Sequence, residues 1–374
     1  MKTSVLTLAV TASLSPLSTF AEQAVEQEIE GLRQRLDYLE QRVRAQDEAI
    51  GEKDEKFKTL EEGPSVEVGA LVEFEAGYAG SFDGASESDL VLATAEIGLA
   101  AEISDSVSAD VTLLYQDNGE EPLDVDVASF TVAGETTSVV VGQIYVPFGV
   151  FDTNLVSDPL TLDLGETRET ALQGGFGNAS VAWSAYLFRG DNQEDFGASD
   201  DIDNFGLSVT FGAQNSAVSA TLGYINDIRD SNGIQNGLDT NDVAEHVAGL
   251  AFSTRYETDR FVLIGEYIDA LDAFAPGELP YRGVGAEPAA WNLEAGIPFA
   301  LAGQDAMFAF GVQGTEEALA LELPERRLLA ALSIPVRDGV TLSVEWAHDT
   351  DYDESDGGTG RRADTVTAQL AVEF

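Results

Sequence analysis

The sequence has no cysteine, only two histidines among its 374 residues, and no lysine after Lys58. Without cysteine the chain can form no disulfide and offers no thiolate to a metal ion. Beyond the N-terminal segment, no stretch reaches about 18 consecutive apolar residues, the length that predicts a membrane-spanning helix. These absences exclude a disulfide-stapled scaffold, a cysteine-ligated metal site and a helical membrane protein.

Basic residues are scarce as well, and the formal net charge is -48. Residues 64–374 contain 54 Asp and Glu against 11 Arg. Nucleic acids and anionic surfaces are poor partners for such a chain, because like charges repel. The acidic excess has two open explanations, which are adaptation to a salty medium and a functional role for particular carboxylates.

The sequence offers few residues for catalysis. A hydrolase needs a nucleophile and a base held together, but His246 and His348 each lie near the edge of an expected loop, with no recognisable serine motif. Acidic stretches such as 349–357 could bind calcium through several oxygens, yet none has the spacing of an EF-hand loop. We therefore predict no enzyme activity, no catalytic residue, no cofactor and no dedicated metal site.

The first residues have the pattern of a secretory signal. Lys2 is followed by a mostly apolar stretch, 5–17, and then by the small-x-small sequence Thr19-Phe20-Ala21. The apolar stretch is too short and too interrupted by polar residues for a membrane helix. We predict that residues 1–21 are a signal peptide.

Residues 22–63 are expected to form a short α-helical coiled coil, because apolar residues alternate at heptad spacings. One seam contains Ile29, Leu36, Val43, Ile50 and Phe57, and the other contains Val25, Leu32, Leu39, Gln46, Lys53 and Leu60. β-branched residues at one seam with Leu at the other favour two strands. A porin barrel favours an assembly of three chains, and the coiled coil must have the same symmetry as the barrel. We predict a homotrimer, with a dimer and a monomeric helix packed under the barrel as alternatives.

From Val66 to Phe374 the sequence consists of short segments in which apolar and polar residues alternate. The first places Val66, Val68, Ala70, Val72, Phe74, Ala76 and Tyr78 on one face. Alternation with a period of two predicts strands with one apolar and one polar face. We count sixteen such segments, an even number, as in bacterial outer-membrane barrels. The predicted fold class is all-β transmembrane, a 16-stranded antiparallel barrel in residues 64–374.

Short and long connections alternate strictly between these segments. The long ones lie near 79–88, 117–123, 147–166, 190–202, 226–245, 269–287, 315–325 and 349–361. Short turns face the periplasm and long loops face outside, so both termini and the coiled coil are expected in the periplasm of a Gram-negative bacterium. A soluble β-sandwich, the alternative fold, would not show this alternation. The aromatic C-terminal residue Phe374 is expected to act in barrel assembly.

The third long loop, 147–166, is too apolar to extend into water. A loop of this length in a compact domain is usually functional. Folding inward would bury its apolar side, narrow the channel and present carboxylates to the lumen. The candidate constriction residues are Phe148, Asp152, Asn154, Asp158, Asp163, Glu166, Arg168 and Glu169. The alternative is a loop that clasps a neighbouring subunit.

Carboxylates are also expected on the inward faces of the strands. The candidate lumen-facing residues are Glu73, Glu75, Glu96, Asp110 and Glu294. A channel lined by carboxylates should prefer cations.

Several segments together resemble a known family. They are Tyr145-Val146-Pro147-Phe148-Gly149, residues 154–159, Gly165-Glu166-Thr167-Arg168-Glu169, residues 67–73 and residues 88–94. These segments, and the order of signal peptide, coiled coil and barrel, resemble the LbtU-type siderophore porins. The resemblance covers essentially the whole mature chain and is strongest in its first half. It implies an outer-membrane barrel linked to ferric-siderophore uptake without an N-terminal plug domain, and it supplies no ligand residues.

The sequence thus predicts an outer-membrane porin for diffusive uptake of small hydrophilic solutes. The resemblance adds ferric siderophores or other ferric chelates to the solutes expected. Outer-membrane lipid and lipopolysaccharide are the other expected partners. A general porin with no siderophore role stays open. So does a structural or surface-binding protein whose coiled coil spaces the barrel from peptidoglycan.

Overall fold

The computed structural model describes residues 65–116, 123–190, 193–194, 202–212, 216–238, 242–243 and 245–374, with backbone only for 193–194 and 242–243. Residues Val66–Phe374 form one compact unit. The predicted signal peptide, 1–21, and coiled coil, 22–63, lie outside the described residues.

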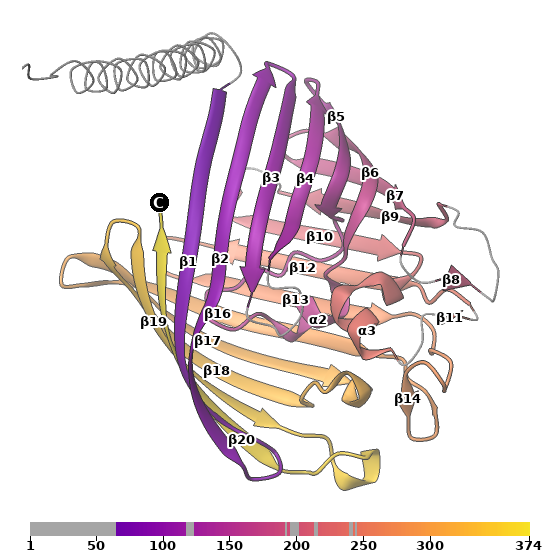
Figure 1. The fold of residues 1–374 in the computed structure, drawn as a ribbon, viewed down its shortest axis with the longest axis vertical. Helices are drawn as coiled ribbons and strands as arrows, with labels where there is room; N and C mark the ends of the chain where they lie inside the picture. The colour runs from indigo at the N-terminus through magenta and orange to yellow at the C-terminus, as the bar shows by residue number, and fades with distance from the viewer. Residues whose placement is uncertain are drawn as a thin grey trace, which may run out of the picture. The chain divides into compact units, whose positions relative to one another are not determined.

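Sixteen antiparallel strands form a closed barrel, as the sequence predicts (Figure 1). Each strand pairs with its neighbour along the chain, and β1 pairs with β20 to close the ring. The strands are β1 (Ser65–Gly80), β2 (Ser86–Ser104), β3 (Val107–Gln116), β4 (Asp124–Ala133), β5 (Thr137–Tyr145), β6 (Arg168–Gly177), β7 (Val181–Phe188), β9 (Asn204–Phe211), β10 (Val218–Ile225), β12 (Gly249–Glu257), β13 (Val262–Ala270), β16 (Ala289–Leu301), β17 (Gln304–Glu316), β18 (Arg326–Arg337), β19 (Val340–Thr350) and β20 (Arg362–Glu373).

The remaining elements lie in the long connections. They are α2 (Leu160–Gly165), α3 (Asn232–Gly237), the single turns η1 (Ile228–Asp230), η2 (Leu319–Leu321) and η3 (Glu354–Asp356), and the short strands β8 (Gln193–Glu194), β11 (Asp242–Val243), β14 (Pro280–Tyr281) and β15 (Val284–Gly285). No helix among the described residues is long and apolar enough to cross a membrane.

The alternation of apolar and polar residues explains which way each side chain points. At the seam that closes the barrel, Phe74 lies opposite Leu370, and both are exposed on the outer face. One residue further along, Glu75 lies opposite Gln369 and accepts a hydrogen bond from its Nε2 at 2.9 Å. Apolar side chains therefore face outward as a lipid-facing surface requires, and polar ones face inward.

The strands extend further than the sequence pattern suggests. β1 continues to Gly80 and β2 begins at Ser86, so the first long connection is 81–85 rather than 79–88. Polar residues at these strand ends, such as Ser86 and Glu87, do not follow the apolar alternation, although the backbone pairs there. Beyond the last strand, the Phe374 amide donates to the Ala70 carbonyl at 3.0 Å.

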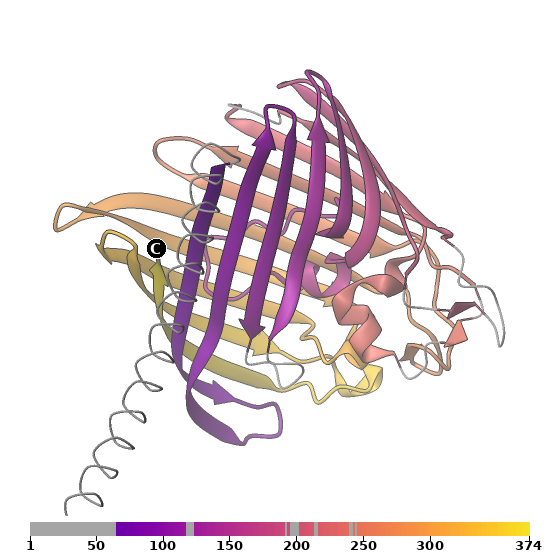
Figure 2. The same ribbon diagram turned by 45° about the horizontal axis from the view of Figure 1, so that its top comes forward.

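An apolar core lies inside the barrel, beneath the long loops. It includes Phe148 and Leu164 of the third loop, Ile234 of α3, and Phe274 of the β13–β16 connection. The inner wall contributes Phe188, Ile225, Ile268 and Ala290. α2 contacts β13, β16 and β17 of the wall, and α3 contacts α2, η1 and η2 at one end of the barrel (Figure 2). The loops therefore fill part of the interior as a packed layer.

Candidate functional site

The third long connection, which runs from Val146 to Thr167 between β5 and β6, crosses the inside of the barrel. Its hydrogen bonds reach three glutamates on strands distant in sequence: Glu266 of β13, Glu294 of β16 and Glu345 of β19. Their sequence neighbours Tyr267, Leu293 and Trp346 are exposed on the outer face, so the glutamates point inward. We call this segment, 146–167, the crossing loop.

Glu266 holds the first part of the crossing loop. Its Oε1 accepts hydrogen bonds from the amides of Val150 and Phe151 at 2.8 and 3.3 Å. Its Oε2 accepts from the Thr161 hydroxyl at 2.7 Å, and the Ser253 hydroxyl of β12 donates to Oε1 at 2.5 Å. A buried carboxylate with this many donors is well compensated for its loss of water.

Glu294 and Glu345 hold the next two parts. Oε1 of Glu294 accepts from the Asn154 amide at 2.7 Å and from its Nδ2 at 2.6 Å, and Oε2 accepts from the Thr153 hydroxyl at 2.7 Å. Oε2 of Glu345 accepts from the Val156 amide at 2.7 Å, and Oε1 accepts from the Ser157 hydroxyl at 2.5 Å. The three carboxylates are only 5%, 4% and 2% exposed, so they anchor the loop rather than line an open channel.

Glycine allows the crossing loop to approach the wall this closely. On β16 and β17, a Cβ at Gly296 would lie 3.1 Å from Asn154 Nδ2, and one at Gly311 would lie 2.7 Å from Leu155. Within the loop, Gly149 has φ of +87°, which glycine adopts without strain. The ring of Phe151 occupies the space that a side chain at Gly149 would need.

The structure places two of the candidate constriction residues away from the lumen. Phe148 is fully buried, and its side chain packs where Cβ atoms at Gly223 and Gly249 would otherwise lie. Asn154 faces the wall, where it binds Glu294. Asp152 remains exposed, with its Oδ2 at 3.5 Å from Arg255 Nη1 of β12. Phe148 and Asn154 thus belong to the packing and anchoring of the loop.

The other loop carboxylates keep contact with the lumen. Asp158 is exposed, and Asp163 and Glu166 are half-buried. Burial raises the pKa of Asp163 to about 6, and it raises the pKa of Glu166 to about 7, with Asp158 adding repulsion. Asp158 also has a raised pKa, because the surrounding protein partly shields it from water and because Glu345 and Glu75 carry like charges nearby. Glu345 and Glu75 lie on β19 and β1, which flank β20 on the same side of the barrel.

Arg168 and Glu169 begin β6, where the crossing loop ends. Arg168 donates to Asp124 at 2.6 Å and to Asp126 at 3.1 Å, and both carboxylates belong to β4. The Tyr145 hydroxyl donates to Asp126 at 2.6 Å. Glu169 is half-buried and lies opposite Ile144 of β5. Arg168 thus balances part of the negative charge near the base of the loop.

The predicted lumen-facing residues divide into two groups. Glu73, Glu75, Glu96 and Asp110 alternate with the exposed outer residues Phe74, Ile97 and Val111 and therefore point into the barrel. Glu294 also points inward, but the crossing loop covers it, so it does not line open space. The sequence shows which face of a strand a residue occupies, whereas it does not show what covers that face.

Sequence reasoning missed several residues that organise the site. Glu266 and Glu345 were not singled out, although each is an isolated acid on the polar face of a strand, the same signal that marked Glu294. Gln313 of β17, fully buried, accepts from the Leu160 amide at 3.2 Å. Arg327 of β18 binds both oxygens of Asp349 at 2.8 and 3.0 Å.

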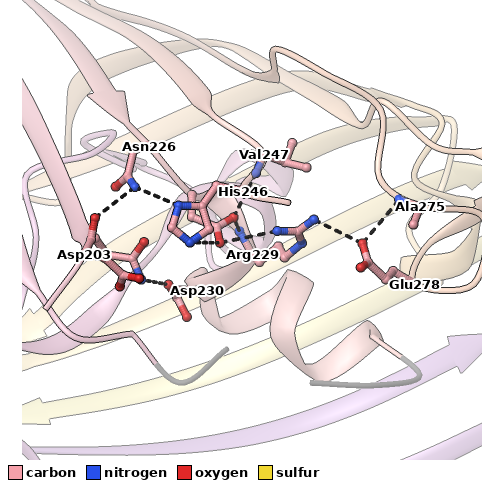
Figure 3. A network of polar contacts seen from close by, with 10 residues as sticks. Asp203, Asn226, Arg229, Asp230, His246, Val247, Ala275 and Glu278 are labelled. Carbon is pink, nitrogen blue, oxygen red and sulfur yellow. Dashed lines mark hydrogen bonds and ion pairs between the residues drawn. The ribbon is translucent and has the colours of Figure 1, made fainter. Parts of the chain in front are cut away.

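A second polar cluster lies above the barrel wall, in the loops after β10 and β13 (Figure 3). Arg229, 1% exposed, donates to Asp227 at 3.5 Å and to Glu278 at 3.2 Å, and its guanidinium lies over the Phe274 ring at 5.4 Å. His246 Nε2 lies 3.9 Å from Asp227, and Asn226 Nδ2 lies 3.2 Å from His246 Nδ1. These contacts tie together the two loops that cover the apolar core.

Over the part of the chain that the structure describes, no group of three or more His, Asp or Glu is arranged to hold a metal ion. Many of the polar groups inside the barrel instead fix the crossing loop to the wall. Such an arrangement can select solutes by size and charge.

Comparisons with known proteins identify distant relatives. No protein-family model matches the chain. A UPF0422 protein of Legionella pneumophila (strain Philadelphia 1) is 27% identical over 342 residues, which cover 77% of this chain and 62% of the relative. A UPF0422 protein of Coxiella burnetii is 26% identical over 317 residues, covering 80% of this chain and 68% of the relative. The chain therefore spans less than two thirds of the Legionella relatives that it matches.

Solved outer-membrane proteins share the fold. The DcaP channel of Acinetobacter baumannii matches with a TM-score of 0.59, covering 83% of this chain and 98% of that one at 13% identity. An anion-selective porin from Comamonas acidovorans matches with 0.60, covering 83% and 100% at 13% identity. OmpT of Vibrio cholerae in its trimer form matches with 0.53, covering 83% and 100% at 10% identity. The chain has the fold of outer-membrane porins.

Proposed function

We propose that this protein is an outer-membrane porin in which the crossing loop forms the constriction. The observation that carries the proposal is the attachment of this loop to three buried glutamates on the far wall. A loop fixed in this way narrows the interior without depending on a partner, and its free carboxylates meet the solute. The fold shared with DcaP, described as an outer membrane channel, supports the same function. In this proposal the protein is not an enzyme, and it resides in the outer membrane.

The charge beside the crossing loop supports a preference for cations. Glu75 acts electrostatically on Asp158 of the loop, and Glu73 acts on Glu96 of the wall, and we call these four carboxylates the acidic rim. A group of negative charges in a narrow space repels anions and attracts cations. Replacing Asp158 by Asn should lower the ratio of K⁺ to Cl⁻ permeability, measured from the reversal potential in a salt gradient. Glu135→Gln in the turn between β4 and β5 is the matched control, because this carboxylate lies outside the rim.

The family resemblance extends the proposal to ferric siderophores. An acidic rim repels anionic ferric hydroxycarboxylates, so neutral or cationic ferric chelates are the better candidates. Single-channel current in a planar bilayer, with ferric chelates added in turn, tests both the porin function and the uptake of ferric chelates. Block by a chelate at micromolar levels supports specific iron uptake, and conductance without block leaves a general porin. A closed channel would refute the porin and favour a structural protein that the coiled coil spaces from peptidoglycan.

The assembly is proposed to be a homotrimer. Support comes from the heptad pattern in residues 22–63 and from the trimer form of OmpT, which has the same fold. The domain order in this proposal is a signal peptide, 1–21, a periplasmic coiled coil, 22–63, and the barrel, 64–374. The third loop lies inside the barrel, and Phe374 acts in barrel assembly.

A further inference from the structure

A cavity of about 290 Å³ lies between the crossing loop and the inner wall, away from the acidic rim. It is lined by Val150, Phe151 and Asp152 of the loop and by residues of β9, β10, β12 and β13. The wall side chains that a solute in this cavity would meet are those of Thr210, Ser219, Thr221, Arg255 and Ile264. Its volume is at the lower end for ligand sites, so it suits a small solute.

The wall of the cavity presents a row of hydroxyl groups. Thr210 lies opposite Thr221, and Thr221 lies opposite Ser253, so three adjacent strands place hydroxyls side by side. The Thr210 and Thr221 oxygens are 3.0 Å apart. The Ser253 hydroxyl is committed to Glu266. Thr210 and Thr221 share one hydrogen bond, which leaves one of their two donors and their remaining lone pairs, together with the Ser219 hydroxyl, to meet a solute. Each hydroxyl can both donate and accept, as a polyol hydroxyl can.

The charged groups around the cavity are one cation, Arg255, and three carboxylates, those of Asp152, Glu257 and Glu266. Arg255 donates from Nε and Nη2 to Glu257 at 3.1 and 2.9 Å, and its Nη1 lies 3.5 Å from Asp152. A guanidinium with two carboxylates gives no net attraction for an anion. The side chains of Arg255 and Asp152 are still 30% and 44% exposed, so they offer a donor and an acceptor side by side. Adjacent hydroxyl groups of one solute can bind such a pair.

Apolar groups complete the surface. Val150 is 44% exposed, and Ile264 and the half-buried Phe151 lie beside it. Carbon-bound hydrogens of a polyol can pack on such a strip while its hydroxyls bind the polar row.

We infer that this cavity is a subsite for an uncharged polyhydroxylated solute of the size of a sugar alcohol or monosaccharide. The inference rests on the proposed porin function, because it names a class of solute that pauses inside the channel. The hydroxyl row, the Arg255–Asp152 pair and the absence of any net positive charge carry it together.

The test compares three probes with chains of similar length but different charge: ribitol, glutarate and cadaverine. Saturation-transfer NMR on the detergent-solubilised full-length protein measures the binding of each. We expect ribitol to bind more tightly than either charged probe, because only ribitol can bind the hydroxyl row and the Arg255–Asp152 pair together. The double variant Thr210→Val/Thr221→Val should weaken ribitol binding about tenfold, because it removes two hydrogen-bonding groups and keeps the shape.

Two further variants check that any loss of binding comes from the cavity. Thr112→Val on the inner face of β3 removes a lumen hydroxyl outside the cavity and should leave ribitol binding unchanged. Ser219→Ala is a smaller change within the cavity and should also weaken ribitol binding. It serves as the test if the double variant does not fold. Equal binding of all three probes, preference for glutarate, or unchanged binding in the cavity variants overturns the subsite.

The same preparation separates the two proposals. Conductance in a bilayer without ribitol binding overturns the subsite and leaves the channel intact. If the protein does not conduct, but binds ribitol and the cavity variants weaken that binding, the subsite is upheld and the proposed porin function is overturned.

Discussion

Glu294→Ala should release the middle of the crossing loop from the barrel wall. The carboxylate is 4% exposed and accepts three hydrogen bonds, two from Asn154 and one from Thr153. Hydrogen bonds to a charged group contribute about 1.5–3 kcal/mol each, so the three together contribute on the order of 5 kcal/mol to this attachment. A loss of about 5 kcal/mol makes local opening roughly four thousandfold more frequent.

Single-channel recording is the assay. The variant should show greater open-channel noise and a larger mean conductance, because residues 152–155 can then move away from the wall. The barrel itself should stay folded, since its strand-to-strand hydrogen bonds are unchanged, and its heat-dependent shift in gel mobility reports this. Glu135→Ala removes an exposed side chain in the turn between β4 and β5, at the end of β5 opposite to the crossing loop, so it should keep wild-type noise. A Glu294→Ala channel with wild-type noise and conductance would refute the anchoring role.

Three further predictions follow from charge and assembly. Between about pH 8 and about pH 5, Glu166 and Asp163 take up protons, because their pKa values are raised to about 7 and about 6. Cation preference should fall through this window, while the docked loop gains stability, since the folded state binds these protons more tightly than the unfolded chain. A Glu166→Gln/Asp163→Asn variant should show neither trend in reversal potentials or in proteolysis of the loop. Arg229→Leu leaves two buried carboxylates without their cation, which costs about 3–5 kcal/mol, so limited proteolysis should cut the loop 226–248 faster, whereas the exposed Arg260→Leu should not change the rate. Deleting residues 22–63 should weaken the oligomer without unfolding the barrel, and a full-strength trimer in analytical ultracentrifugation would contradict the role assigned to the coiled coil.

The fold was accessible from sequence because lipid imposes a simple rule on every strand. Outer residues must be apolar and inner residues can be polar, so Phe74 and Glu75 can be assigned to opposite faces without knowing their neighbours. The extra length of β1 and β2 could not be predicted from the sequence. Strand ends that extend beyond the lipid need no apolar outer residues, although their backbone continues to pair.

The site was only partly accessible, because it depends on contacts between residues far apart in the chain. The apolar content of 147–166 indicated a loop with something to pack on. It did not indicate that Phe148 would lie in the core, nor that Glu294 would be covered. Glu266 and Glu345 carry the same local pattern as the uncovered Glu75, and only the path of the loop across the barrel distinguishes them.

The three glutamate anchors also constrain the order in which the molecule assembles. The crossing loop leaves the wall after β5, but its partners belong to β13, β16 and β19, between 105 and 189 residues further along the chain. Contacts between such distant segments form late in folding, since the intervening chain must first be ordered. The loop therefore has nothing to bind until the C-terminal half of the barrel is in place. A half-inserted chain would lack the attached loop, so the interior of the barrel takes its final form only as the ring closes.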